Sequence, residues 1–368
     1  MEYIFCNKNK EIALLRLENE LSGIEVIDTC ESGIPKVVGD IGLFISSRRP
    51  PKKRKYITEL LTKLGCNTLK GYIDLTYCLS LKDTFWVKPY SSNIRWEEVS
   101  LFRNPYNTII SKICLEGFNN DVVLGGTTLS PEFGTDGCFA KSWRNSNGRI
   151  ELYKLGSIEF NREPYSEYYA NQIQEVFRVN KVAYDLDYYN NNICSVCECF
   201  TNEDTGYIAF GDIRFGKYTG DNIWSILSKL GYREFVRDMV ISDVLSLNVD
   251  RHIYNFGFLY DMDTYSIKGM APLFDNNMSL LPYMSDKELE DRLYVIESTH
   301  PSLDYTWLES YSNHIEDLIE VYDKIDRMRY FEFSRHRKYN LSDRRIRLLE
   351  DIVREQARRV IRDIDNLY

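Results

Sequence analysis

The chain has 368 residues, 43% of them hydrophobic and 14% aromatic, so it can bury the cores of two or three packed subdomains. This composition excludes an intrinsically disordered chain, and a net charge of -9 is unlike the basic balance of a dedicated nucleic-acid-binding domain. We therefore expect a globular protein that makes no direct contact with nucleic acid.

Cysteine usage and hydropathy indicate the cellular compartment of the protein. The nine cysteines are an odd number, the first residues lack the charged and apolar stretches of a secretory leader, and no run approaches the 18 apolar residues of a membrane span. We expect a reduced, cytoplasmic protein with no membrane partner. Cys194, Cys197 and Cys199 are closely spaced in CSVCECF, but no second pair follows, so we expect buried strand cysteines rather than a zinc site.

Residues 1–115 predict an N-terminal α/β subdomain. The pattern at 56–65 is typical of a short helix that ends at Gly65, and 84–90 is typical of a strand. The basic run RRPPKKRK at 48–55 is compatible with a contact to an acidic partner or nucleic acid, but we expect a solvated loop closed by its two prolines.

Residues 116–200 predict a β-rich part. A strand is expected at 149–157, a helix at 164–179 and a second strand at 193–200.

The rest of the chain, 201–368, predicts a helical part. Amphipathic patterns indicate helices at 233–247 and 343–366. A β-rich half followed by a helical half is typical of a two-lobed molecule, and clefts between lobes commonly bind small ligands.

A charged and amide-rich segment, LSLNVDRHIYNFGFLYD at 245–261, follows the helix predicted at 233–247. It runs into an apolar strand, and a turn leads to a second strand that ends at Asp275, so the two strands predict a hairpin. The hairpin would bring Asp250, Asn255 and Asp275 to one end. Carboxylate and amide oxygens of this kind are the ligands that Mg²⁺ prefers.

The spacing of these three residues matches a division of labour in phosphoryl transfer. Protein kinases use an Asp as the catalytic base, an Asn five residues later for one Mg²⁺, and a later Asp for the bridging Mg²⁺. Asn255 is five residues after Asp250, and Asp275 is 25 after it. Asp and Asn at this spacing are common in turns, so the prediction rests on the helix before the pair and the hairpin after it. We assign Asp250 as the base, and Asn255 and Asp275 as metal ligands.

A nucleotide site of this kind also needs a cation on a strand, to neutralise the phosphates, and a carboxylate to orient that cation. We assign Lys154, at the end of the strand IELYK, as the cation and Glu167 on the following helix as its partner. Lys141 and Glu163 are the alternatives. Side chains alternate along a strand, so Leu152 shares the face of Lys154 and would lie against the adenine.

Two further segments complete the predicted nucleotide site. The turn FGTDG would cover the phosphates, because its glycines let backbone N–H groups approach anions. This turn contains Gly134, Thr135, Asp136 and Gly137. The backbone at the junction of the β-rich and helical parts would bond the adenine edge. This junction consists of Glu198, Cys199 and Phe200.

These segments resemble the HipA-like family, the bacterial serine/threonine kinases of toxin–antitoxin modules and their relatives. NVDRHIYNFGF and MAPLFDNN resemble that family's catalytic loop and metal-binding segment. FGTDGCFAK and ELYKLG resemble its phosphate loop and nucleotide-lysine strand, SEYYANQI the helix that follows, and CECF the hinge strand. The resemblance covers roughly residues 120–285 and, more loosely, the helical C-terminus.

The resemblance implies an α+β, divergent two-lobed protein-kinase-like fold, with a β-rich N-lobe at 116–200, a helical C-lobe at 201–368 and the α/β subdomain at 1–115 in addition. It also implies ATP and Mg²⁺, a protein Ser or Thr as the acceptor, and an antitoxin protein as a partner. Family members can autophosphorylate a loop Ser, for which Ser130 is the nearest candidate, with Thr127, Thr128 and Thr135 close by. The phosphate loop departs from the family because it lacks the usual Gln-containing turn.

Two other functions fit parts of the pattern. Phosphoinositide kinases also have an Asp-Arg-His segment with Asn five residues after the Asp, so DRHIYN is compatible with a lipid or small-molecule kinase. The acidic chain, without a basic amphipathic helix directed at membranes, argues against this function. The third function is a nucleotide-binding pseudokinase that acts as an interaction module. The complete set of Lys154, Glu167, Asp250, Asn255 and Asp275 argues against it.

Overall fold

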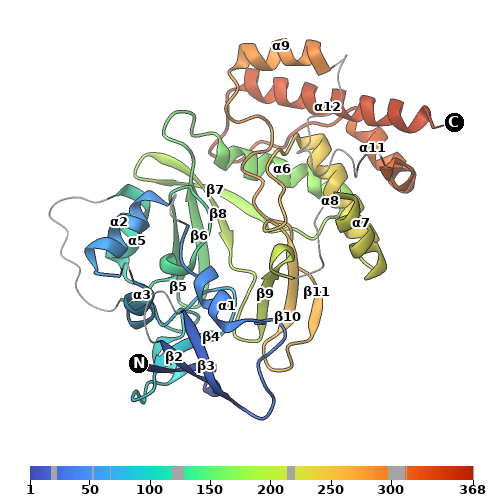
Figure 1. Cartoon of the computed structure of the whole chain (residues 1–368). Helices are drawn as coiled ribbons and strands as arrows, with labels where there is room; N and C mark the ends of the chain where they lie inside the picture. Colours follow the sequence, from blue (N-terminus) through green and yellow to red (C-terminus); the bar gives the residue numbers. More distant parts are fainter. Residues whose placement is uncertain are drawn as a thin grey trace. The chain divides into compact units, whose positions relative to one another are not determined.

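The computed structural model of the chain (Figure 1) describes residues 1–17, 23–51, 54–66, 68–117, 128–213, 220–296, 311 and 313–367. The chain forms two compact units. Unit 1 comprises Met1–Lys154, Cys197–Ile208 and Phe258–Gly269, and unit 2 comprises Leu155–Val196, Ala209–Gly257 and Met270–Tyr368. The three-part division at residues 115 and 200 stays a prediction.

Unit 1 is built on a four-stranded sheet in which β1 pairs antiparallel with both β2 and β4. Its strands are β1 (Glu2–Asn7), β2 (Lys10–Leu17), β3 (Ile24–Thr29) and β4 (Phe85–Pro89). Its helices are α1 (Ile41–Ser47), α2 (Lys55–Lys63), α3 (Leu69–Thr76), α4 (Trp96–Val99) and α5 (Thr108–Glu116). In the core, the rings of Phe5 and Phe85 stack with centroids 5.5 Å apart, and Phe44 of α1 meets both edge-on. The predicted helix at 56–65 corresponds to α2 and the predicted strand at 84–90 to β4, so both predictions are confirmed.

Two smaller groups of strands belong largely to unit 1. One is the antiparallel hairpin of β5 (Lys141–Ser146) and β6 (Arg149–Leu155), which follows the short 3-10 helix η1 (Pro131–Gly134). The other is a three-stranded sheet of β9 (Thr205–Ala209), β10 (Gly257–Asp261) and β11 (Ile267–Met270), in the order β11-β10-β9. The predicted hairpin is confirmed, but its second strand ends at Met270 and the chain reaches Asp275 in an irregular conformation.

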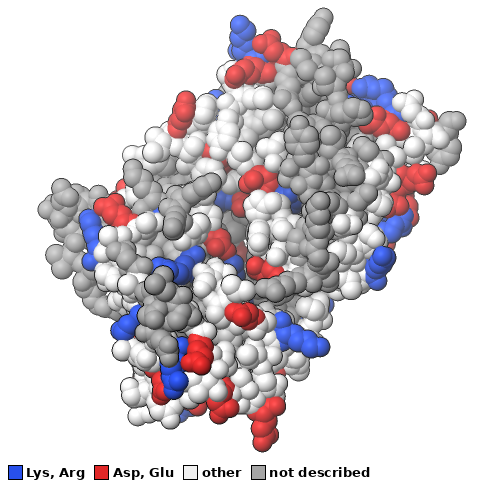
Figure 2. All heavy atoms as spheres, in the orientation of Figure 1, with Lys and Arg blue, Asp and Glu red and all other residues white. Residues whose placement is uncertain are grey.

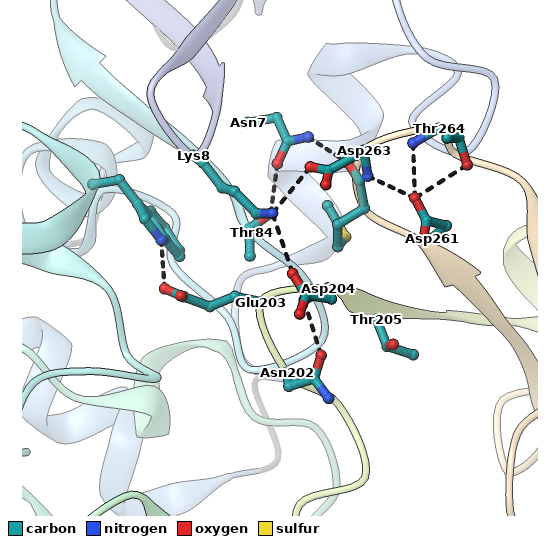
Figure 3. Close-up of polar contacts among 12 residues, drawn as sticks. Asn7, Lys8, Thr84, Asn202, Glu203, Asp204, Thr205, Asp261, Asp263 and Thr264 are labelled. Carbon is teal, nitrogen blue, oxygen red and sulfur yellow. Dashed lines mark hydrogen bonds and ion pairs between the residues drawn. The ribbon is translucent and has the colours of Figure 1, made fainter.

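A polar cluster joins the first hairpin of unit 1 to the turn of the β10–β11 hairpin (Figure 3). The Lys8 ammonium lies 3.0 Å from the Asp263 carboxylate and 3.7 Å from that of Asp204, and the Asn7 amide donates to the carbonyl of Met262. The turn itself is ordered by Asp261, whose carboxylate accepts two backbone N–H groups. Those hydrogen bonds lower the pKa of Asp261 to about 2. The cluster therefore ties N-terminal residues to a hairpin more than 250 positions later, which the sequence alone does not indicate.

The basic run at 48–55 is a correction to the sequence analysis. Arg48 and Arg54 are buried, so the solvated-loop interpretation is wrong for these two residues. Arg48 pairs with Asp83 and also donates to the carbonyls of Cys78 and Phe85. The run looked solvated because both of its carboxylate partners, Asp83 and Glu132, lie far away in the sequence.

Unit 2 is mainly helical. Its strands β7 (Tyr184–Tyr189) and β8 (Asn192–Glu198) are neighbours in a sheet. Its helices are α6 (Glu163–Phe177), η2 (Phe210–Asp212), α7 (Gly220–Lys229), α8 (Arg233–Ser246), α9 (Asp286–Ile296), η3 (Ile315–Val321), α11 (Tyr322–Met328) and α12 (Asp343–Asp365). Helix α8 is nearly surrounded by protein from Val236 onward, whereas α12 buries one apolar face and runs beside α9 (Figure 1). The helices at 164–179, 233–247 and 343–366 and the strands at 149–157 and 193–200 are confirmed within a few residues.

Cysteines and surface charge agree with the composition. None of the nine cysteines, all in the described part of the chain, forms a disulfide. Cys194 and Cys197 are buried in β8 as expected, whereas Cys199 lies just after β8 and is only half-buried. On the face drawn in Figure 2, acidic and basic side chains are interspersed. In the part of the chain that the structure describes, no helix is both long enough and apolar enough to span a membrane.

Candidate active site

The loop that carries Asp250 is built on the end of α8. Leu247 ends the helix in the left-handed conformation, with a φ of 51°. The Asn248 side chain then donates to the Asp243 carboxylate at 2.9 Å and accepts the backbone N–H of Asp250 at 3.2 Å. These bonds fix the backbone at Asp250, while the residue itself is exposed to solvent. An exposed carboxylate on a fixed backbone is suited to meet an incoming substrate.

Arg251 lies at the centre of the site and has no exposed surface. Its guanidinium forms two hydrogen bonds with the Asp243 carboxylate, at 2.9 and 3.1 Å. It also donates to the carbonyls of Asn255 at 3.2 Å and Phe274 at 2.6 Å. One side chain therefore brings the Asp250–Asn255 loop next to the segment that contains Asp275.

The electrostatics of Arg251 follow from this geometry. Burial disfavours the charged guanidinium, but the nearby carboxylates outweigh burial and raise the pKa of Arg251. Asp243 contributes most to this effect, followed by Asp275 and Glu167. Arg251 therefore stays charged, and Asp275 lies close enough to raise the pKa of the guanidinium.

Asn255 is held so that its amide oxygen is the atom that a metal could use. Its side-chain nitrogen donates to the carbonyl of Asp250 at 2.9 Å, and its backbone N–H donates to the carbonyl of His252 at 2.8 Å. Asp275 has a φ of +60°, which is uncommon and strained for a residue with a side chain, and its N–H donates to the Tyr184 hydroxyl at 3.1 Å. One amide oxygen and one carboxylate fit the hard oxygen donors that Mg²⁺ prefers, with substrate phosphates supplying further ligands.

Asn276 connects the Asp275 segment to α6. Its backbone N–H donates to the Glu167 carboxylate at 2.9 Å, and its side-chain oxygen accepts from Arg251 at 2.7 Å and from Gln174 at 3.1 Å. Glu167 is fully buried, so the structure places it against the Asp275 segment in unit 2. Its assignment as the partner of Lys154, a residue of unit 1, stays a prediction. The alternative, Glu163, is also buried, and one of its carboxylate oxygens has no hydrogen-bond partner among the described residues.

The two candidate lysines are cross-strand neighbours. Lys141 of β5 pairs directly with Lys154 of β6, and both are buried. Residues opposite each other in a sheet share a face, so the two ammonium groups belong to one small region of unit 1. Lys141 also donates to the backbone carbonyl of Asp136 at 2.7 Å. The sequence treats the two lysines as alternatives, whereas the structure brings them together.

A buried ion pair supports the predicted phosphate turn. Arg54 bonds the Glu132 carboxylate at 2.9 Å and donates to the carbonyl of Thr135 at 2.8 Å. Gly137 has a φ of +90°, which favours glycine, and a Cβ there would lie 2.2 Å from the Lys141 ammonium, so the lysine would have to move. Gly134 is needed for a different reason, because a Cβ there would lie 2.7 Å from the Leu79 carbonyl.

Ser130 precedes this turn, and Asp136 lies within it. Ser130 is buried and caps η1 by accepting the N–H of Glu132, whereas Asp136 is exposed and pairs with Lys82 at 2.6 Å. Thr127 lies outside the described residues.

The predicted adenine-binding residues all lie in unit 1. Leu152 is half-buried and on the same face of β6 as Lys154. The Cys199 N–H donates to the carbonyl of Ile150 at 2.9 Å, so an adenine contact would have to use other backbone groups of the segment from Glu198 to Phe200. The Phe200 ring packs edge-on against another ring of unit 1.

Comparisons with known proteins bear on the fold. No protein-family model matches the sequence, and no curated protein matches it significantly. HipA of Shewanella oneidensis MR-1, solved as a toxin–antitoxin complex with HipB and operator DNA, aligns over 99% of this chain and 99% of its own. The identity is 12% and the TM-score 0.56. The Helicobacter pylori proinflammatory kinase CtkA aligns over 62% of this chain and 94% of its own, with 19% identity and a TM-score of 0.47. The chain has a HipA-like kinase fold.

In this HipA-like fold, the sequence analysis missed the residues that hold the predicted catalytic residues in place. Arg251 was visible beside Asp250, but nothing in the sequence indicates that it pairs with Asp243, eight residues earlier, or with Asn276. Sequence position could have pointed to Arg251 and Asn276, because each directly follows a predicted functional aspartate.

The Arg251–Asp243 pair can be tested through stability. Asp243→Asn preserves the shape of the side chain but leaves a buried guanidinium without its carboxylate, which costs about 3–5 kcal/mol. We expect the free energy of unfolding in urea to fall by that amount. The matched control is Asp351→Asn, which removes the exposed partner of Arg354 and should cost less than about 1 kcal/mol. Equal losses in the two variants would show that the buried pair has no special weight.

Proposed function

We propose that this protein is an ATP- and Mg²⁺-dependent protein serine/threonine kinase of the HipA-like type. The observation that carries the proposal is the position of Arg251, which bonds the carbonyls of Asn255 and of Phe274, the residue before Asp275. The predicted base and both predicted metal ligands thereby belong to one polar site in unit 2. The HipA-like fold is consistent with this chemistry but does not by itself establish it.

The chemistry divides among residues as follows. Mg²⁺, when bound, neutralises the charge on the transferred phosphoryl group. Asn255 and Asp275 would hold it through an amide oxygen and a carboxylate. Asp250 would accept the proton of the acceptor hydroxyl, because it is exposed and its backbone is fixed by Asn248.

The nucleotide contacts are proposed for unit 1. Lys154 would neutralise the phosphates, and the turn from Gly134 to Gly137, with Thr135 and Asp136, would cover them through its backbone. Leu152 would contact the adenine, whose edge would bond the backbone of the segment from Glu198 to Phe200.

A small antitoxin protein is the proposed partner. HipA of Shewanella oneidensis MR-1 was solved with HipB, and the alignment of this chain with HipA covers 99% of each. A Ser or Thr of another protein is the proposed acceptor, and the cytoplasm the proposed compartment.

Incubation of the purified chain with γ-labelled ATP, Mg²⁺ and a cell extract tests the function. Labelled protein, with phosphoserine or phosphothreonine on hydrolysis, is the expected result. Label recovered only in lipid would instead indicate a lipid kinase. Nucleotide binding without transfer would indicate a pseudokinase.

The role of Asp250 can be separated from nucleotide binding. Asp250→Asn keeps the shape but removes the basic carboxylate, and positioned proton transfer is worth roughly 10²–10⁴-fold. We expect phosphoryl transfer to fall by that factor while calorimetry shows near-normal affinity for ATP and Mg²⁺. Loss of nucleotide binding in this variant would mean that Asp250 is a ligand or a structural residue.

The two buried lysines are ranked by a paired comparison. Lys154→Ala should weaken ATP binding by about 10-fold or more, because a hydrogen bond to a charged group contributes roughly 1.5–3 kcal/mol. Lys141→Ala should weaken ATP binding less, because the Lys141 ammonium already bonds the carbonyl of Asp136. The reverse ranking in calorimetry would transfer the phosphate role to Lys141.

A further inference from the structure

The segment between Asp275 and α9 has a strained backbone. Leu280 and Leu281 are consecutive residues in the left-handed region, with φ angles of 58° and 52°. For a residue with a side chain, this conformation is sterically unfavourable. Such a conformation persists only where the surrounding structure imposes it.

Two arginines from different elements hold this segment by its carbonyl groups. Arg345, in α12, donates to the carbonyl of Leu281 at 3.1 Å and to that of Met284 at 2.8 Å. Arg162, just before α6, donates to the carbonyl of Pro282 at 3.3 Å and to the same Met284 carbonyl at 2.7 Å. We refer to Arg162 and Arg345 as the arginine clamp.

The clamp is electrostatically unfavourable, because it places two positive charges close together. The two guanidinium groups meet at one carbonyl oxygen, and the Arg345 side chain is only 4% exposed. Burial lowers the pKa of Arg345, and the charge of Arg162 lowers it further, although Asp286 opposes both effects. Placing a buried cation close to a second cation is unfavourable, so the arrangement points to a requirement for this backbone conformation rather than for stability.

The clamped segment is linked to the proposed active site at its other end. The Leu280 N–H donates to the carbonyl of Ser246, the last residue of α8, at 2.7 Å. The Ser279 N–H donates to the carbonyl of Asn276 at 3.0 Å. A change in the backbone at Leu280 would therefore be passed to Asn276 and Asp275 through a few residues with little freedom.

We propose that Arg162 and Arg345 are positioning residues for phosphoryl transfer, which hold the segment from Leu280 to Met284 so that Asp275 is correctly placed. The proposal rests on the proposed kinase function. Neither arginine touches the nucleotide or the acceptor. The ring of Tyr283 packs against Phe160, which precedes Arg162, so the clamp also has apolar support.

The test uses the full chain with substitutions in the clamp and a matched control in the same helix. Arg345→Ala removes two carbonyl contacts, and Arg345→Lys keeps the charge but cannot donate in a planar fork. The control is Arg344→Ala, because Arg344 is the neighbouring residue of α12, is exposed, and pairs with Glu290 at 2.6 Å. Arg162→Ala is a second route to the same effect if Arg345→Ala folds poorly.

The first readout is backbone hydrogen exchange in residues 278–286, which needs no activity. Arg345→Ala and Arg162→Ala should speed exchange there, and Arg344→Ala should leave it unchanged. Unchanged exchange in both clamp variants overturns the proposal. Because this readout does not depend on catalysis, it separates failure of the clamp from failure of the kinase function, which an inactive wild-type protein would reveal.

The second readout is the division of the effect between kcat and KM. A displacement of about 1 Å of a group at the reacting centre can cost 10²-fold. We expect kcat to fall by about 10- to 100-fold in Arg345→Ala, less in Arg345→Lys, with the KM for ATP changed by less than about 3-fold. A wild-type kcat in Arg345→Ala, or a loss confined to KM, contradicts a positioning role.

Discussion

The buried guanidinium of Arg251 joins helix α8, the loop with Asp250 and Asn255, and the segment with Asp275 and Asn276. A buried charge is costly unless it is paired and its hydrogen bonds are satisfied. The folded state is therefore most stable with Asp243 and these carbonyls in place. Since one nitrogen of Arg251 bonds both the Asn255 and the Phe274 carbonyls, a shift of either segment leaves that charge without its partners.

Three strained backbone positions lie in the same part of unit 2. Asp275, Leu280 and Leu281 are left-handed although none is a glycine. Arg251 and Glu167 hold the beginning of this stretch, and the arginine clamp holds its end. A few buried cations that bond carbonyl groups thus specify a conformation that local preferences oppose. Strain of this kind fits the proposed role of Asp275, because a metal ligand has to point in one direction.

Local patterns predicted much of the fold. The 3.6-residue period predicted α6, α8 and α12, strand-like sequence predicted β6 and β8, and the spacing of Asp250, Asn255 and Asp275 located residues that the structure brings together. The pairings of Arg251, Arg48 and Arg54 could not be predicted in this way. Their partners are brought near by tertiary packing, and a charged residue is normally assumed to be solvated. Cross-strand register, which sets Lys141 against Lys154, is likewise a property of the hairpin rather than of either strand.

The account depends most on the claim that Asn255 and Asp275 bind the metal of a nucleotide complex. A crystal structure of the chain with Mn²⁺ in place of Mg²⁺ and a non-hydrolysable ATP analogue tests it directly, because Mn²⁺ is located by its anomalous scattering. We expect a metal peak within ligand distance, about 2.0–2.2 Å, of the Asn255 amide oxygen and the Asp275 carboxylate, in contact with the phosphates. A nucleotide-bound Mn²⁺ that touches neither residue would contradict the account.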